Sequence, residues 1–179
     1  MGRHVRALVR RFGPADSGIA AIEFALLAPV LILLLLGCVT LFILFRNSAA
    51  AENATFTVAD IVSREVAVTN AKLEIDRGLF VAMLGDSSAT AGLRISSVKK
   101  TLGIYTVDWT YAVTPMVPMT VATIPTADLP LVTDGDSMVI VESTVTYTPL
   151  FAYVGLPGGT YANIATNRPR FTTAIVKSD

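Results

Sequence analysis

A single carboxylate, Glu23, stands inside the longest apolar stretch of this 179-residue sequence. The stretch reads GIAAIEFALLAPVLILLLLGCVTLFILF and runs from Gly18 to Phe45. A charged side chain at the middle of a membrane costs about 2.5–3.5 kcal/mol on insertion scales, less near an end, and those that persist usually have a partner. The chemistry that Glu23 indicates is therefore charge pairing, and the question is which cation meets it.

The residue types that catalysis or metal binding requires are scarce. The sole histidine, His4, precedes the apolar stretch, and the sole cysteine, Cys38, lies inside it. The serines and threonines have no evident base, and the sequence has no glycine-rich phosphate loop. The triplet Asp134–Asp136 matches a fragment of a calcium loop without the remaining ligand spacing, so we interpret it as a turn. We expect no catalytic residue, no metal site and no cofactor.

The apolar stretch itself is long enough to cross a membrane. Between Phe24 and Phe45 there is no Asp, Glu, Lys, Arg or His, and an α-helix over this range would rise about 33 Å, against a hydrocarbon core of about 30 Å. The chain as a whole is 53% hydrophobic and 16% charged, which is too apolar for an ordinary soluble domain. We predict a transmembrane helix over residues 19–45.

Charge on either side of this helix predicts its orientation. The first 18 residues hold four arginines, Arg3, Arg6, Arg10 and Arg11, against the single Asp16, whereas only Arg46 follows the helix before Glu52. The positive-inside rule then places the N-terminus in the cytoplasm and the C-terminal part in the periplasm of a two-membrane bacterium. After Gly18 there are ten basic and thirteen acidic residues, so we expect no nucleic acid partner.

Two simpler hypotheses compete for the N-terminal third. A cleaved signal peptide would use a small-residue site such as SAAAEN, Ser48–Asn53, but the apolar run is too long and is separated from this site by Arg46 and Asn47. A plain signal anchor fits the hydrophobicity and the charge bias, but it leaves Glu23 unexplained. If Glu23 merely lies at the interface, its carboxylate reaches water.

The residues around Glu23 carry a family resemblance. The segment RRFGPADSGIAAIEFALLAPVLILLLLG resembles the N-terminus of type IV prepilin-like proteins, and is most similar to the TadE/TadG-like pseudopilins of the tight-adherence (Tad, or Flp pilus) system. The resemblance covers Arg10 to about Glu52, and a weaker one lies at DSMVIVESTVTYTPLF near the C-terminus. It implies that a prepilin peptidase cleaves between Gly18 and Ile19, which makes Glu23 the fifth mature residue and Phe24 the aromatic that follows.

The same resemblance implies a partner for the carboxylate. In related pilins the glutamate is thought to meet the new α-amine of a neighbouring subunit, a group whose pKa is ordinarily about 7.7–8.0. Such a pair would fix the axial register of adjacent helices. The implied partners are the peptidase, other pilins and pseudopilins, the tight-adherence inner-membrane platform and the lipid bilayer. Pro29, inside the span, predicts a kink.

Beyond Arg46 the pattern predicts two more elements of helix. Small and apolar residues recur at three- and four-residue intervals, which predicts that the first helix continues to about Ser63 with one buried face: Ala51, Ala54, Val58, Ile61 and Val62. A second helix is predicted over Ala71–Leu84, with Gly85 as its C-cap. The charged residues of this region are expected on a solvated face.

The remainder predicts strands. Alternation in GIYTVDWTYAV places Tyr105, Val107, Trp109, Tyr111 and Val113 on one buried face. Further strands are predicted over MVIVESTVTY, RFTTAIVK and, more weakly, GLRISSVKKT, with turns at TPMVPM, TDGDS and GLPGG.

The sequence thus predicts an α+β protein in four parts: a cytoplasmic basic leader (1–18), a transmembrane helix (19–45), a periplasmic helical stalk (46–85) and a periplasmic antiparallel sheet domain (86–179). The predicted function is that of a minor pilin or pseudopilin in assembly of a tight-adherence pilus or related secretion apparatus, a substrate of an enzyme and not an enzyme. The alternative is an unprocessed bitopic inner-membrane protein whose periplasmic head binds or scaffolds a partner.

Overall fold

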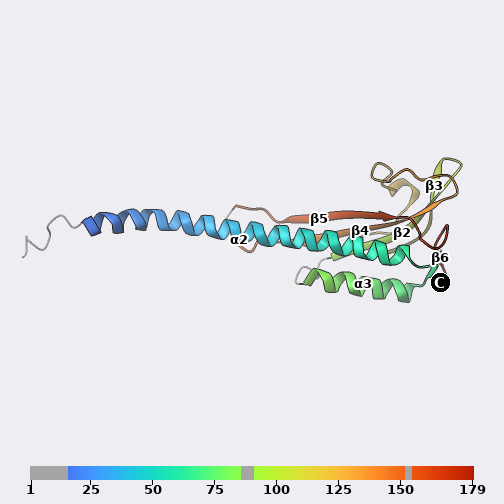
Figure 1. Cartoon of the computed structure of the whole chain (residues 1–179), viewed down its shortest axis with the longest axis horizontal. Coiled ribbons are helices and arrows are strands. Elements are labelled where there is room, and N and C mark those ends of the chain that lie inside the picture. The colour runs from blue at the N-terminus through green and yellow to red at the C-terminus, as the bar shows by residue number, and fades with distance from the viewer. Residues whose placement is uncertain (1–15, 86–90, 152–154) are drawn as a thin grey trace, which may run out of the picture.

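The computed structural model describes residues 16–85, 91–151 and 155–179. A long first helix, α2, projects as a rod from a group formed by the other elements (Figure 1). Those elements are a second helix, a four-stranded antiparallel sheet and a two-stranded parallel ribbon. The predicted α+β class, with a long N-terminal helix and a small antiparallel sheet, is confirmed.

Helix α2 runs over Asp16–Ser63, 48 residues, and continues through Pro29. The predicted end near Ser63 is confirmed. There the N–H of Arg64 donates to the carbonyl of Ile61 at 3.1 Å, a tighter i to i+3 turn that closes the helix. The predicted apolar span and the following stalk segment are thus parts of one continuous helix.

Helix α3 covers Asn70–Leu84 and returns alongside the C-terminal part of α2 (Figure 1). Its N-cap is Thr69, whose hydroxyl accepts a hydrogen bond from the N–H of Lys72 at 3.2 Å. Its C-cap is Gly85, where φ is 59°, in the region that glycine tolerates best. The second predicted helix and its C-cap are confirmed.

The main sheet has the strand order β3-β2-β4-β5 and is antiparallel throughout. Its strands are β2 (Ala91–Thr101), β3 (Ile104–Val113), β4 (Ser137–Tyr147) and β5 (Gly159–Asn167). The connection from β3 to β4 contains the short 3-10 helix η3, Val121–Thr123. The strands predicted over GLRISSVKKT, GIYTVDWTYAV and MVIVESTVTY are confirmed, whereas β5 was not predicted.

The strand predicted over RFTTAIVK is wrong except at its end. Only Val176–Lys177 forms a strand, β6, and it pairs in parallel with β1, Ala67–Val68. The earlier part of this segment is held by the end of α2, because the N–H of Arg170 donates to the carbonyl of Ser63 at 2.8 Å. The place beside β4 in the sheet is taken by β5.

One face of the sheet packs on the two helices. Buried side chains from α2, α3 and the strands form one continuous core there. The helices after residue 50 and the sheet are therefore a single packed unit, which we call the head. Four of the five apolar residues predicted for the α2 face, Ala51, Ala54, Val58 and Val62, are fully buried in this core, and Ile61 is half-buried. The other large members of this core are Val68, Leu73, Phe80, Leu84, Leu93, Ile95, Trp109, Val139, Val141, Val145 and Ile175.

The opposite face of the sheet is covered by the chain between β3 and β4. Met119, Ile124 and Val132 of that connection pack against Met138 and Ile140 of β4 in a second core. The sheet is thus buried on both faces, by helices on one side and by a long connection on the other.

The prediction of a single buried face for β3 is wrong. In the pairing with β2, Trp109 lies opposite Ser97 while Val107 lies opposite Val98, so Asp108 is an extra residue at a bulge. A bulge of one residue reverses the faces of a strand, since side chains alternate with a period of two. Trp109 and Tyr111 therefore belong to the helix-side core, and Tyr105 and Val107 pack in the second core.

Candidate assembly segment

The residues predicted to serve processing and assembly lie together at the start of α2. Gly18, Ile19, Glu23 and Phe24 fall in its first three turns, because the helix begins at Asp16. All four are exposed, Ile19 at 62% and Phe24 at 69% of their full surface. The arginines predicted to orient the chain, and the histidine His4, lie outside the described residues.

The bond between Gly18 and Ile19 lies in the first turn of α2. The first four N–H groups of a helix have no carbonyl partner within it, so this turn is the easiest part of the helix to unwind. A Cβ atom added at Gly18 would meet no atom of the described chain within 4 Å. A larger residue at position 18 would therefore leave the fold intact. An effect of such a substitution on cleavage could then not be attributed to misfolding.

The Glu23 side chain is exposed near the N-terminal end of α2. Within the described ranges no hydrogen bond or ion pair involves its carboxylate, and its flanking residues Ile22 and Phe24 are large, apolar and exposed. Because α2 begins at Asp16, Glu23 lies beyond the first turn, where the positive end of the helix macrodipole gives a carboxylate little support. A full charge partner would have to come from outside the described part of the chain.

Between Ile19 and Phe45 the surface of α2 is almost entirely apolar. Within the described residues, this is the one helix that is long and apolar enough to cross a membrane. Its exposed large side chains are Ile19, Ile22, Phe24, Leu26, Leu27, Val30, Leu31, Ile32, Leu33, Leu34, Leu35, Val39, Leu41, Phe42 and Phe45. The free thiol of Cys38 is also exposed on this shaft.

The end of the shaft nearest the sheet is covered along one stripe, which the sequence did not predict. Thr40 is almost fully buried, and its hydroxyl donates to the carbonyl of Leu36 at 2.8 Å. The hydroxyl of Tyr161 on β5 donates to the carbonyl of Leu44 at 2.8 Å. A signal for this contact was present in the sequence, since no charged residue occurs between Glu142 and Arg168.

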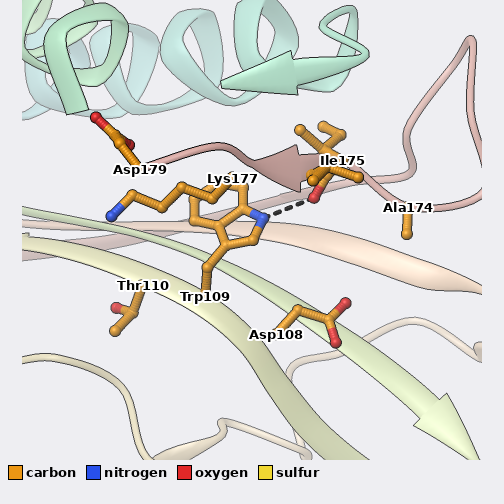
Figure 2. A pocket seen from close by; sticks show the side chains of 8 residues that line it. Asp108, Trp109, Thr110, Ala174, Ile175, Lys177 and Asp179 are labelled. Atoms are coloured by element: carbon orange, nitrogen blue, oxygen red, sulfur yellow. Dashed lines mark hydrogen bonds between the residues drawn. The ribbon is translucent and has the colours of Figure 1, made fainter. Parts of the chain in front are cut away.

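A second candidate site is a cleft of about 550 Å³ at the edge of the sheet, beside β3 and β6 (Figure 2). The indole of Trp109 reaches from β3 towards the C-terminal segment, where its Nε1–H donates to the carbonyl of Ile175 at 2.7 Å. Lys177 and Asp179 lie on one side of the indole and Asp108 on the other. The Asp179 carboxylate accepts from the N–H of Asn70 at 2.8 Å, so it ties the C-terminus to the start of α3.

The acidic triplet weighed as a calcium loop belongs to a turn, as predicted. The Asp134 carboxylate accepts from the N–H of Gly103 at 3.0 Å, and a carboxylate oxygen of Asp136 lies 3.6 Å from the guanidinium of Arg168. Among the described residues, no group of three or more histidine, cysteine, aspartate or glutamate side chains is placed to hold a metal ion.

Comparison with known proteins identifies the N-terminal part of the chain. Residues 18–60 match the family model described as TadE-like protein. No curated protein matches the chain, and no solved structure matches it. The match begins at Gly18 and covers the exposed shaft, Glu23 and the buried alanine face, whereas the weaker resemblance near the C-terminus lies outside it.

The resemblance stated from the sequence is therefore confirmed over this range. It supports involvement of the chain in the tight-adherence pilus system and, with a helix able to span a membrane, association with a membrane. The segment 18–60, which carries every residue predicted for processing and assembly, is a TadE-like segment.

Proposed function

We propose that the chain is a minor pilin or pseudopilin of a tight-adherence pilus or related secretion apparatus, assembled through the N-terminal part of α2. The observation that carries the proposal is the exposed Glu23, without a partner in the described residues, inside the matched segment. A carboxylate kept in an apolar shaft is costly unless something meets it. A second subunit is the partner that an assembly protein would supply.

The first step in this function is removal of the leader, residues 1–18, by a prepilin peptidase at the cytoplasmic face. The arginines of the leader hold the N-terminus in the cytoplasm, which places residues after Arg46 in the periplasm. Cleavage creates a free amine on Ile19. The start of the family match at Gly18 supports this position of the cut.

The second step is pairing of Glu23 with the α-amine of a neighbouring subunit. In the low dielectric of the membrane the carboxylate and the ammonium group attract each other, and neither charge is then left without a partner. Because both groups lie at one end of a continuous helix, pairing sets how far one helix is shifted along the next. Other pilins and the inner-membrane platform of the system are the partners for the rest of the shaft.

The alternative function is an unprocessed bitopic membrane protein whose head binds or scaffolds a partner. The cleft beside Trp109 favours this second candidate, because it lies on the head and is lined by an aromatic ring and by the charged side chains of Asp108, Lys177 and Asp179. Both functions use the span, residues 19–45, and the packed unit that follows it. They differ in the fate of the leader.

The experiment that tests the proposal is mass spectrometry of the undigested protein isolated from its native membrane, which shows whether residues 1–18 are still attached. A mature N-terminus at Ile19 is expected, and Gly18→Leu is expected to block cleavage, because a side chain at the residue before the cut would obstruct a narrow peptidase site. Ala20→Leu is the matched control, since Ala20 is an exposed residue of the same helix just past the bond. An intact leader on the wild-type chain, or cleavage of Gly18→Leu at the same bond, would contradict the proposal.

A further inference from the structure

The described parts of the connection from β4 to β5, residues 148–151 and 155–158, extend from the sheet along the apolar shaft of α2 (Figure 1). A cleft of about 280 Å³ separates this connection from the helix. It is lined by Leu41, Leu44 and Phe45 of the shaft on one side and by Tyr147, Leu156 and Tyr161 on the other. The head therefore touches residues that belong to the apolar run itself.

The composition of this connection differs from that of the opposite end of the head. No charged residue lies between Glu142 and Arg168, a range that includes the end of β4, the whole connection and all of β5. At the opposite end of the sheet, Lys99 of β2 lies across from Ser137 of β4. Three further charged residues lie at this end, Asp134, Asp136 and Arg168. The head is thus polarised, with an uncharged end beside the span and a charged end away from it.

The uncharged end has an exposed apolar side chain, Leu150, and two half-buried tyrosines, Tyr147 and Tyr161. Leu150, in the connection, keeps 58% of its surface exposed. The rings of Tyr147 and Tyr161 stack with centroids 4.4 Å apart where the connection leaves the sheet. Tyrosine at the level of the headgroups, with apolar residues beyond it, is the arrangement found at membrane interfaces.

Depth along α2 is consistent with this placement. Leu41, where the cleft begins, lies five residues on the membrane side of Arg46, about 7 Å along the helix axis. Irregular backbone exposed to lipid does not occur in the hydrocarbon core, but apolar segments lie about 5–10 Å into the headgroup boundary. Leu156, which lines the cleft with Leu41, is therefore placed at the depth of that boundary.

We propose that the β4–β5 connection, through Leu150, Leu156 and the stacked tyrosines, is a second membrane contact that seats the head on the lipid bilayer. The proposal rests on the insertion of the shaft proposed above. The occupant is lipid, because the uncharged surface is continuous with the apolar shaft that the bilayer covers. Seating the head by two contacts, the helix and the connection, fixes its tilt relative to the membrane.

The test uses the full chain in lipid vesicles, with single cysteines in a Cys38→Ala background labelled with a nitroxide. Leu150→Cys reports the connection, Leu102→Cys reports the β2–β3 turn at the charged end, and Leu33→Cys reports the shaft. All three positions are exposed, so labelling disturbs no core. The measured quantity is the ratio of collisions with oxygen, which dissolves in lipid, to collisions with a water-soluble nickel chelate.

A ratio at Leu150→Cys several-fold above that at Leu102→Cys, and below that at Leu33→Cys, is the expected result. Free access of nickel at Leu150→Cys, with Leu33→Cys protected, would overturn the lipid contact while leaving insertion of the shaft intact. Low access of both reagents at Leu150→Cys, with spin–spin broadening between labels, would assign the surface to a second copy of the chain and also overturn the proposal. Free nickel access at Leu33→Cys would overturn insertion itself, and with it the lipid contact.

Discussion

Among single residues, Trp109 shows how one buried aromatic side chain joins separate parts of the head. It follows the bulge at Asp108, packs among helices and strands, and donates a hydrogen bond to Ile175 near the C-terminus. Only 9% of its surface is exposed, which confirms that it belongs to the core. The bulge determines this role, because without the extra residue the indole and Val107 would share one face.

Trp109→Ala is expected to lower the free energy of unfolding of the head by about 3–5 kcal/mol, the usual cost of removing a large buried aromatic side chain. Trp109→Phe is the matched variant. It keeps most of the buried surface and loses one hydrogen bond, so the expected loss from that bond is about 1 kcal/mol. Denaturant unfolding of the full chain in detergent, followed by circular dichroism, measures both. Equal stability of Trp109→Ala and the wild type would show that the indole contributes nothing to the core.

A tyrosine next to Trp109 provides a test that depends on pH. Burial, together with a hydrogen bond to Glu74, raises the pKa of Tyr111 to about 12. A raised pKa stabilises the folded chain below the ordinary tyrosine value of about 10, and this stabilisation is lost as pH rises through about 12. Tyr111 is therefore expected to ionise well after an unperturbed tyrosine in a titration of phenolate absorbance.

Glu74→Gln is expected to lower the pKa of Tyr111 without restoring its ordinary value, because burial is the larger cause. Glu52→Gln is the control, since Glu52 is an exposed carboxylate on the other helix. If Glu74→Gln left the late titration step unchanged, the contact between the phenol and Glu74 would not exist in solution.

At the scale of elements, the close approach of α2 to the sheet depends on small residues. Ala51, Ala54 and Ala59 are fully buried on the face of α2 that meets the core. The hydroxyl of Thr55, which follows Ala54 in the helix, lies 2.7 Å from the hydroxyl of Ser143 on β4, and both hydroxyls are buried. A continuous helix thus carries exposed leucines at one end and a closely packed alanine face at the other.

Ala54→Leu is expected to destabilise the head by about 1–3 kcal/mol, because extra methylene groups in a packed core force side chains or backbone to shift. Asn53→Leu places the same side chain at the neighbouring exposed position and is expected to leave stability nearly unchanged. Denaturant unfolding of the two variants in the same detergent gives the comparison. A smaller loss for Ala54→Leu than for Asn53→Leu would contradict the packing of α2 on the sheet.

Elements with strong periodic patterns could be predicted from the sequence, and elements with weak ones could not. The apolar run, the alanine face and the alternation in β4 are long and regular, and each corresponds to an observed element. Strand β5, in contrast, reads GTYANIATN, and its helix-side positions are Tyr161, Asn163 and Ala165, which give no apolar alternation. The segment before β6 alternates better but is held by the end of α2 through Arg170.

The candidate site shows the same division. Glu23 and Gly18 could be chosen as candidates from the sequence alone, because a charge in an apolar run and a glycine after a basic leader are visible there. The contact of Tyr161 with Leu44 joins residues far apart in the chain, and only the folded sheet brings them together. The cleft beside Trp109 likewise depends on the bulge and on the parallel pairing of β1 with β6.

In the whole molecule, the two halves of α2 have different surroundings. The shaft has an exposed surface of apolar residues and one carboxylate, and the other half is the central helix of the head. Because the helix is continuous, a change in the register of the shaft against a neighbour would move the head with it. Pairing at Glu23 would thus set the position of the head as well as that of the helix.

The most direct measurement is the assembly of a Glu23→Gln chain in its native membrane. Membrane abundance and cleavage after Gly18 are expected to equal those of the wild type, since removing a charge from the span eases insertion and no contact in the described fold is lost. Incorporation, measured as co-purification with other pilins and as pilus output, is expected to fall several-fold. Glu52→Gln, a carboxylate of the same helix outside the span, is expected to assemble normally. Wild-type incorporation of Glu23→Gln would contradict the pairing of Glu23 with a neighbouring subunit.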